Sequence, residues 1–164
     1  MDFKKEMKNA WEASIPSNII LAIILLLTFI ITNLTDSTIM FEIPIILHYL
    51  IYFSLFLYAG FRATYNGKGS KITAGLAGST CAVVIGVLDI IILTIAMIMV
   101  MGSEPDAIPE ELATQLGGEA AASTVVLLVA VIVLAIVVLI SAIINFAIGM
   151  LGGIIGEKLG AMKK

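Results

Sequence analysis

The sequence predicts an all-α integral membrane protein, a bundle of four transmembrane helices with both termini in the cytoplasm. Three observations lead to this prediction. Hydrophobic residues make up 60% of the 164 residues and charged residues only 13%, against roughly 45–50% and about 25% in soluble domains. The apolar residues form four long blocks, and nearly all charges stand between these blocks. The basic and acidic charges are also segregated along the chain.

The four apolar blocks cover residues 18–32, 44–61, 72–101 and 120–155. A helix needs about 20 apolar residues to cross the hydrocarbon core of a bilayer. Because lipid offers the backbone no hydrogen-bond partner, each block should be a helix. The connections are short, so we expect one membrane domain over residues 1–164.

The charges predict the orientation of the helices. Every Lys and Arg falls in one of three segments, at Lys4, Lys5 and Lys8, at Arg62, Lys68 and Lys71, or at Lys158, Lys163 and Lys164. The other two connections contain acidic residues and no basic one. By the positive-inside rule, this pattern predicts a multi-pass protein of the cell (plasma) membrane with its N- and C-termini inside. The first block could instead be a signal peptide, but "TNLTDS" follows it without a small-x-small cleavage site, so we expect it to be retained.

Residues 1–15 predict an interfacial amphipathic helix. Phe3, Met7, Trp11 and Ile15 recur every four residues, and the lysines lie on the other side. We expect these four residues to anchor the segment at the membrane surface, or to sense lipid or tension, before Pro16 breaks the helix. On the outer side, residues 103–119 form an acidic loop that should contain a short helix between Pro109 and Gly117.

Small residues recur at helical spacing in the third and fourth blocks. Ala74, Gly78, Ala82 and Gly86 form one stripe, which a helical wheel extends to Asp89. The fourth block has two stripes, one with Gly149 and Gly153 and one with Gly152, Gly156 and Gly160. Small residues allow close helix packing in lipid. Such a glycine zipper predicts two neighbours, one within the chain and one across a subunit boundary, although glycine is frequent in membrane helices in any case.

Asp89 is the acidic residue inside the third block. Antiparallel second and third helices would place it near His48, with Tyr49 and Tyr52 as further hydroxyl partners. This intramembrane pair could serve as a structural hydrogen bond, as a salt bridge to a partner subunit, or as a proton or cation relay. Polar residues at matching depths predict interhelical hydrogen bonds between the third and fourth helices, at Ser79, Thr80, Ser141 and Asn145.

The composition argues against several functions. One histidine and one cysteine cannot supply the usual metal site or a Ser, His and Asp triad, so we expect no metal, no cofactor and no enzyme. "NGKGSK" lacks the glycine spacing of a phosphate loop. The nine basic residues form no patch of the size that nucleic acid needs.

The segment "NFAIGMLGGIIGEKLG", residues 145–160, is similar to the glycine-rich last helix of small prokaryotic four-span membrane proteins of uncharacterised function. This resemblance implies topology only. From the residues, we expect a non-enzymatic accessory or assembly protein that associates with other membrane helices through its glycine and alanine faces. It would act in the lipid bilayer as a homo-oligomer or as a subunit of a larger complex. The alternative is a homo-oligomeric ion or proton conduit that uses Asp89.

Overall fold

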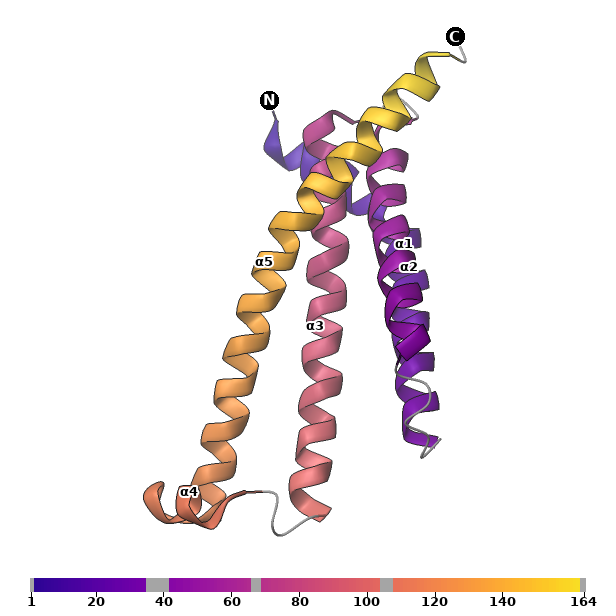
Figure 1. The fold of residues 1–164 in the computed structure, drawn as a ribbon. Helices are drawn as coiled ribbons and strands as arrows, with labels where there is room; N and C mark the ends of the chain where they lie inside the picture. Colours follow the sequence, from indigo (N-terminus) through magenta and orange to yellow (C-terminus); the bar gives the residue numbers. More distant parts are fainter. Residues whose placement is uncertain (1, 35–41, 66–68, 104–107, 163–164) are drawn as a thin grey trace. The chain divides into compact units, whose positions relative to one another are not determined.

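The structure of the chain is a computed structural model that describes residues 2–34, 42–65, 69–103 and 108–162. Side chains are described for these ranges except at residues 31–34, 42–48, 102–103 and 112. Within these ranges the secondary structure is all helical (Figure 1). The helices are α1 (Phe3–Leu34), α2 (Glu42–Tyr65), α3 (Lys71–Ser103), α4 (Glu110–Gln115) and α5 (Glu119–Ala161).

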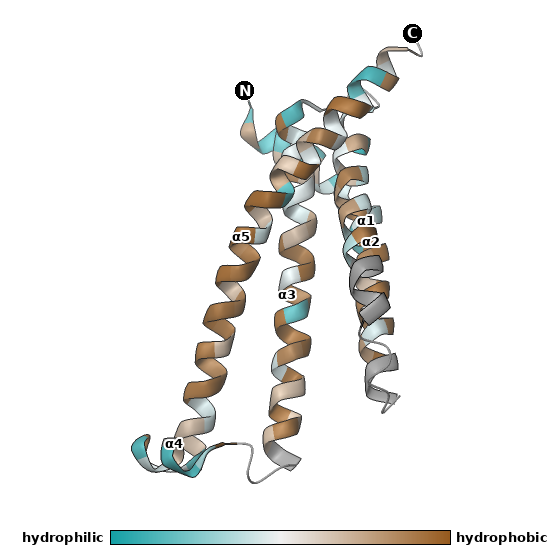
Figure 2. Cartoon of the chain, viewed as in Figure 1, coloured by the Kyte–Doolittle hydropathy of each residue, from teal (hydrophilic) through white to brown (hydrophobic). Residues whose placement is uncertain are grey.

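Three stretches among the described residues are long and apolar enough to cross a membrane. They are Phe3–Ile30, Lys71–Met101 and Glu119–Ala161. Figure 2 shows the hydrophobic colouring along α3 and α5 and the hydrophilic colouring of α4. The helix α2 forms over the block expected as a further span, but the side chains of its first seven residues, 42–48, lie outside those described. The described residues therefore give three candidate spans rather than the four we expected.

Pro16 does not end the first helix. We expected a break between an interfacial helix over residues 1–15 and a span over 18–32, but α1 continues through Pro16. A proline inside a helix removes one hydrogen bond and favours a kink, which the remaining bonds can tolerate. Figure 1 shows the first part of α1 running in a different direction from the part that lies alongside α2. The two predicted elements are thus one bent helix.

The contacts divide the chain into two compact units, which are described separately. Unit 1 contains Met1–Ile85 and Ile140–Lys164, and unit 2 contains Gly86–Leu139. Most side chains buried in unit 1 are small, and among the fully buried ones leucine is the largest, at Leu21. The small buried residues are Ala10, Ala13, Ser14, Ser17, Ala59, Ala63, Thr73, Ala74, Ala77, Cys81 and Ala82. Such residues let helix backbones approach closely, so this core is held by backbone proximity more than by large side chains.

Unit 2 contains the end of α3, the short helix α4 and the first half of α5. The helix α4 ends as the sequence predicts, because Gly117 and Gly118 have φ values of 85° and 122°. The amide of Gly118 donates to the carbonyl of Ala113 at 2.8 Å, which closes the helix end. Most large aliphatic side chains of α3 and α5 in this unit are exposed, as expected of surfaces that face acyl chains.

Candidate functional site

One glycine face of α5 packs against α3 in unit 1. An ideal Cβ placed on Gly78 would lie 3.0 Å from the Cα of Gly149, and closer still to the carbonyl oxygen of Asn145. A Cβ on Gly149 would collide with the carbonyl oxygen of Ala74, and a Cβ on Gly153 with the Ala74 side chain. The predicted stripe on α3 and the stripe containing Gly149 and Gly153 therefore meet each other.

The other glycine face of α5 packs against α2 in the same unit. A Cβ on Gly156 would lie 2.5 Å from the carbonyl oxygen of Phe61, and one on Gly160 would lie 2.6 Å from that of Tyr65. At Gly152 it would overlap the carbonyl group of Leu57. We expected one of the two glycine faces to meet another subunit, and that expectation is corrected. Both faces are occupied within the chain, because α5 lies against α2 and α3 together.

The remaining predicted packing residues also lie in helix contacts. Ala74 and Ala82 are buried in unit 1. Gly86 belongs to unit 2, where a Cβ on it would lie 2.8 Å from one methyl group of Val138 on α5. A further glycine that sequence reasoning did not single out, Gly60 on α2, approaches the backbone of Gly149 too closely to accept a Cβ.

The four residues predicted to form interhelical hydrogen bonds behave differently from one another. The hydroxyl of Ser79 donates across the interface to the carbonyl of Ala142 at 2.8 Å. The hydroxyl of Thr80 instead donates to Leu76 in its own helix, because a threonine hydroxyl in a helix can reach the carbonyl one turn back. Ser141 and the buried side chain of Asn145 form no hydrogen bond with the described residues.

A polar cluster, which we call the polar end, joins the first turns of α1 and α3. Ser70 and Thr73 form a reciprocal cap at the start of α3: the Ser70 amide donates to the Thr73 hydroxyl at 2.8 Å, and the Thr73 amide donates to the Ser70 hydroxyl at 3.3 Å. Both hydroxyls also donate to one carboxylate oxygen of Glu6, the Ser70 hydroxyl at 3.1 Å. This carboxylate therefore lies at the positive end of the α3 dipole, where a negative charge is stabilising. Serine is a favoured N-cap residue, and Ser70 before the apolar run of α3 is a capping signal that our sequence reasoning missed.

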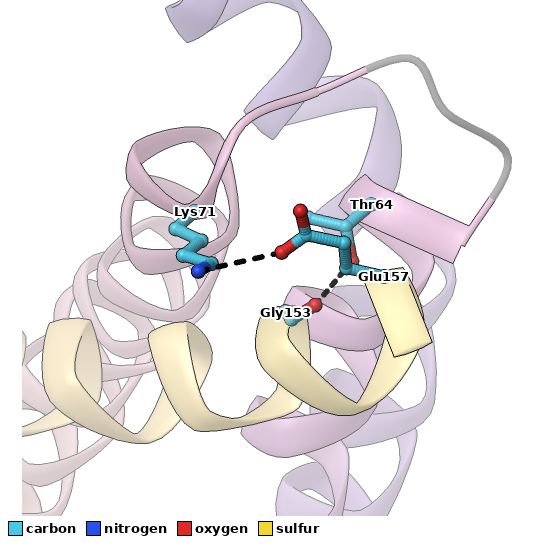
Figure 3. Close-up of polar contacts among 4 residues, drawn as sticks. All are labelled: Thr64, Lys71, Gly153 and Glu157. Carbon is cyan, nitrogen blue, oxygen red and sulfur yellow. Dashed lines mark hydrogen bonds and ion pairs between the residues drawn. The ribbon is translucent and has the colours of Figure 1, made fainter. Parts of the chain in front are cut away.

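Two contacts attach the end of α5 to α3 and to α2 (Figure 3). The Lys71 ammonium at the start of α3 lies 3.5 Å from the Glu157 carboxylate, and both side chains are largely exposed. The Thr64 hydroxyl of α2 donates at 2.8 Å to the carbonyl of Gly153 in a buried position. The buried hydrogen bond is the stronger constraint, because exposed ion pairs contribute at most about 1 kcal/mol.

The structure does not place the predicted pair of Asp89 and His48. His48 lies in α2, but its side chain is outside those described. Asp89 is half-buried in unit 2 and forms no hydrogen bond or ion pair with a described residue. In unit 1, Tyr49 is exposed, and Tyr52 makes an edge contact with Phe56 at a ring distance of 6.0 Å.

A buried polar group on α1 was not predicted. The Ser17 hydroxyl donates to the Leu55 carbonyl of α2 at 3.0 Å, and the Asn18 amide donates to the Ser14 hydroxyl at 3.3 Å. The thiol of Cys81, the only cysteine, lies 3.9 Å from the Ser14 carbonyl and is fully buried. The Ser17 bond attaches α1 to α2 just after Pro16, and the Cys81 contact attaches α1 to α3 just before it.

The described residues contain no group of three or more His, Cys, Asp or Glu side chains that could hold a metal ion. The hydrogen bonds and ion pair between α1, α2, α3 and α5 described above join these helices to one another. Comparison with known proteins found no matching family model, curated protein or solved structure.

Proposed function

We propose that the chain is a non-enzymatic integral membrane protein that associates with other membrane helices, as an accessory or assembly subunit. The observation that carries this proposal is Asp89. It lies within the candidate span Lys71–Met101, half-exposed and without a hydrogen-bond or ion-pair partner among the described residues. A carboxylate in that position costs several kcal/mol unless another group covers it.

The association surface in this proposal is the outer half of α3 rather than the glycine faces. The glycines of α5 are already in contact with α2 and α3, so they are not free for a partner. Leu93, one turn further along the same face of α3 as Asp89, is also exposed. A partner helix with a hydrogen-bond donor or a basic group at that depth would cover the carboxylate, and aliphatic contacts would surround it.

The proposal includes a topology of four spans with both termini in the cytoplasm of the cell. The segregation of the nine basic residues from the acidic outer segments supports it. It is tested in a Cys81→Ala background with single cysteines at Lys5→Cys or Glu111→Cys and a membrane-impermeant maleimide applied to intact cells. Labelling at position 111 alone is expected. Labelling at position 5 would contradict the orientation.

The alternative function is a homo-oligomeric ion or proton conduit in which Asp89 of each copy faces the conducting path. It is favoured by the same residue, because a carboxylate near a small-residue position, here Gly86, suits a narrow conducting path. The two functions predict different complexes. An accessory subunit has a foreign partner, whereas a conduit is a closed ring of identical chains.

The deciding experiment is native mass spectrometry of the complex extracted in mild detergent from its own membrane. A stoichiometric foreign subunit that is lost in Asp89→Asn, and kept in the control Glu111→Gln, supports the accessory function. A homo-oligomer whose ion or proton flux falls in Asp89→Asn would favour the conduit. A monomer in both the unchanged protein and Asp89→Asn would overturn both, because no chain would then cover the carboxylate.

A further inference from the structure

The start of α1 presents three different faces. One face, with Ala10, Ala13 and Ser14, is buried against the rest of unit 1, and Glu6 reaches from it to the polar end. A second face consists of exposed apolar side chains, with Phe3 60% and Trp11 52% exposed, together with Met7 and Ile15. The third face is charged. The exposed apolar side chains are spaced by four residues, so they follow one another along the helix as a stripe beside the buried residues.

The first turn of this segment is capped and attached to α3, so the apolar face has a defined direction. The carboxylate of Asp2 caps the first turn by accepting hydrogen bonds from the amides of Lys4 and Lys5, at 3.1 and 3.4 Å. The contacts of Glu6 with the Ser70 and Thr73 hydroxyls attach the same turn to α3. The apolar side chains are thus exposed although the opposite side of the same helix is packed.

The charges next to the apolar face leave two unpaired cations. The formal charges of residues 2–12 cancel, with three acidic and three basic side chains. Each acid, however, already has a partner: Asp2 caps α1, Glu6 binds at the polar end, and Glu12 lies 3.9 Å from Lys8. Lys4 and Lys5 form no ion pair with the described residues. On the helical wheel, Lys4 lies directly beside Trp11.

We propose that this segment is a binding surface for the headgroups of anionic phospholipids. Phe3, Met7, Trp11 and Ile15 enter the boundary between headgroups and acyl chains, and Lys4 and Lys5 meet the phosphates. The segment is the first part of the candidate membrane span Phe3–Ile30, which brings it to the bilayer. The pairing of an apolar face with adjacent lysines is the arrangement that anionic surfaces attract.

Trp11 is the only tryptophan in the chain, so its fluorescence reports on this face alone. The full-length protein is reconstituted in phosphatidylcholine vesicles and in vesicles that also contain phosphatidylglycerol. Part of the phosphatidylcholine carries bromine on its acyl chains as a quencher. Near an anionic surface each lysine contributes about 1 kcal/mol, which is about fivefold in the population of the bound state.

We expect stronger quenching of Trp11 with phosphatidylglycerol present, and loss of that increase in the double variant Lys4→Gln, Lys5→Gln. The control Arg62→Gln, Lys158→Gln removes two exposed cations elsewhere and should retain it. Quenching that is equal in both lipids and in both variants would overturn the proposal, because apolar contact alone would account for it. Absence of quenching in either lipid would overturn it as well, because Trp11 would not be at the bilayer. Thermal unfolding of each variant checks that the fold is retained.

Discussion

Replacing Gly152 with leucine should push α5 away from α2. An ideal Cβ at this position would lie 2.9 Å from the carbonyl carbon of Leu57 and from the amide nitrogen of Phe61, whereas ordinary van der Waals contact begins at 3.4 Å. The helices must therefore separate by at least about 0.5 Å, which forfeits about a quarter of the dispersion energy at each contact. The leucine carbons beyond Cβ also meet the backbone of α2 and increase the separation of the two helices further.

The net destabilisation is the overpacking cost less a gain in helix propensity. Overpacking costs about 1–3 kcal/mol, and the upper end applies where rigid backbone is the neighbour. Leucine is a better helix former than glycine by about 0.8 kcal/mol. The Gly152→Leu variant should therefore lose about 2 kcal/mol, which lowers the Tm by about 4–8 °C in a chain of this size. Gly152→Ala should lose less stability. Its side chain overlaps less with α2, and the gain in helix propensity offsets more of the overpacking cost.

The thiol of Cys81 provides the assay. It is the only cysteine and is fully buried in unit 1, so a dye that fluoresces on reaction with thiols reports the opening of that unit during heating. The matched control is Ala147→Leu, which adds the same side chain at an exposed position of α5. If Gly152→Leu and Ala147→Leu unfold within about 1 °C of each other, the reasoning on close approach is wrong.

Three further predictions use the same assay. Thr64→Val should cost about 1 kcal/mol by removing the buried hydrogen bond to Gly153, and Thr64→Ser should restore most of the loss. Lys71→Gln should change the stability by less than about 1 kcal/mol, since its ion pair with Glu157 is exposed, and a larger loss would indicate a role beyond that pair. Glu6→Ala should cost about 1–3 kcal/mol, because two hydroxyls and the start of α3 lose a negative partner, and an unchanged Tm would contradict that contact.

The helices and their small-residue faces were predictable from the sequence because both follow from local patterns. A long apolar block must be helical in lipid, and residues spaced by four share a face, as Gly78 and Ala82 do. The neighbour of each face is a long-range property. Two glycine faces on α5 required two neighbouring helices. The spacing of the glycines alone could not show that both neighbours, α2 and α3, come from the same chain as α5.

The continuity of α1, the hydrogen bond of Thr80 and the contact of Glu6 could not be predicted from local sequence patterns. The first two depended on competition between alternatives of similar energy. Pro16 favours a break, yet the surrounding hydrogen bonds and the buried contacts of Ser14 and Ser17 keep α1 continuous. The Thr80 hydroxyl could bond across the interface or within its own helix, and the local bond prevailed. Glu6 is 64 residues from Ser70 in the chain, so no local pattern indicated their contact.

The feature on which the fold of unit 1 depends most is the packing of α5 against α2 and α3 of its own chain. Its most direct test is cross-linking of Lys71→Cys and Glu157→Cys in a Cys81→Ala background with a short bis-maleimide, in the membrane, because the native side chains meet at 3.5 Å. We expect a cross-linked product with the mass of one chain, with positions 71 and 157 joined within one molecule. A product with the mass of two chains, in which position 71 of one copy is joined to position 157 of another, would contradict the account.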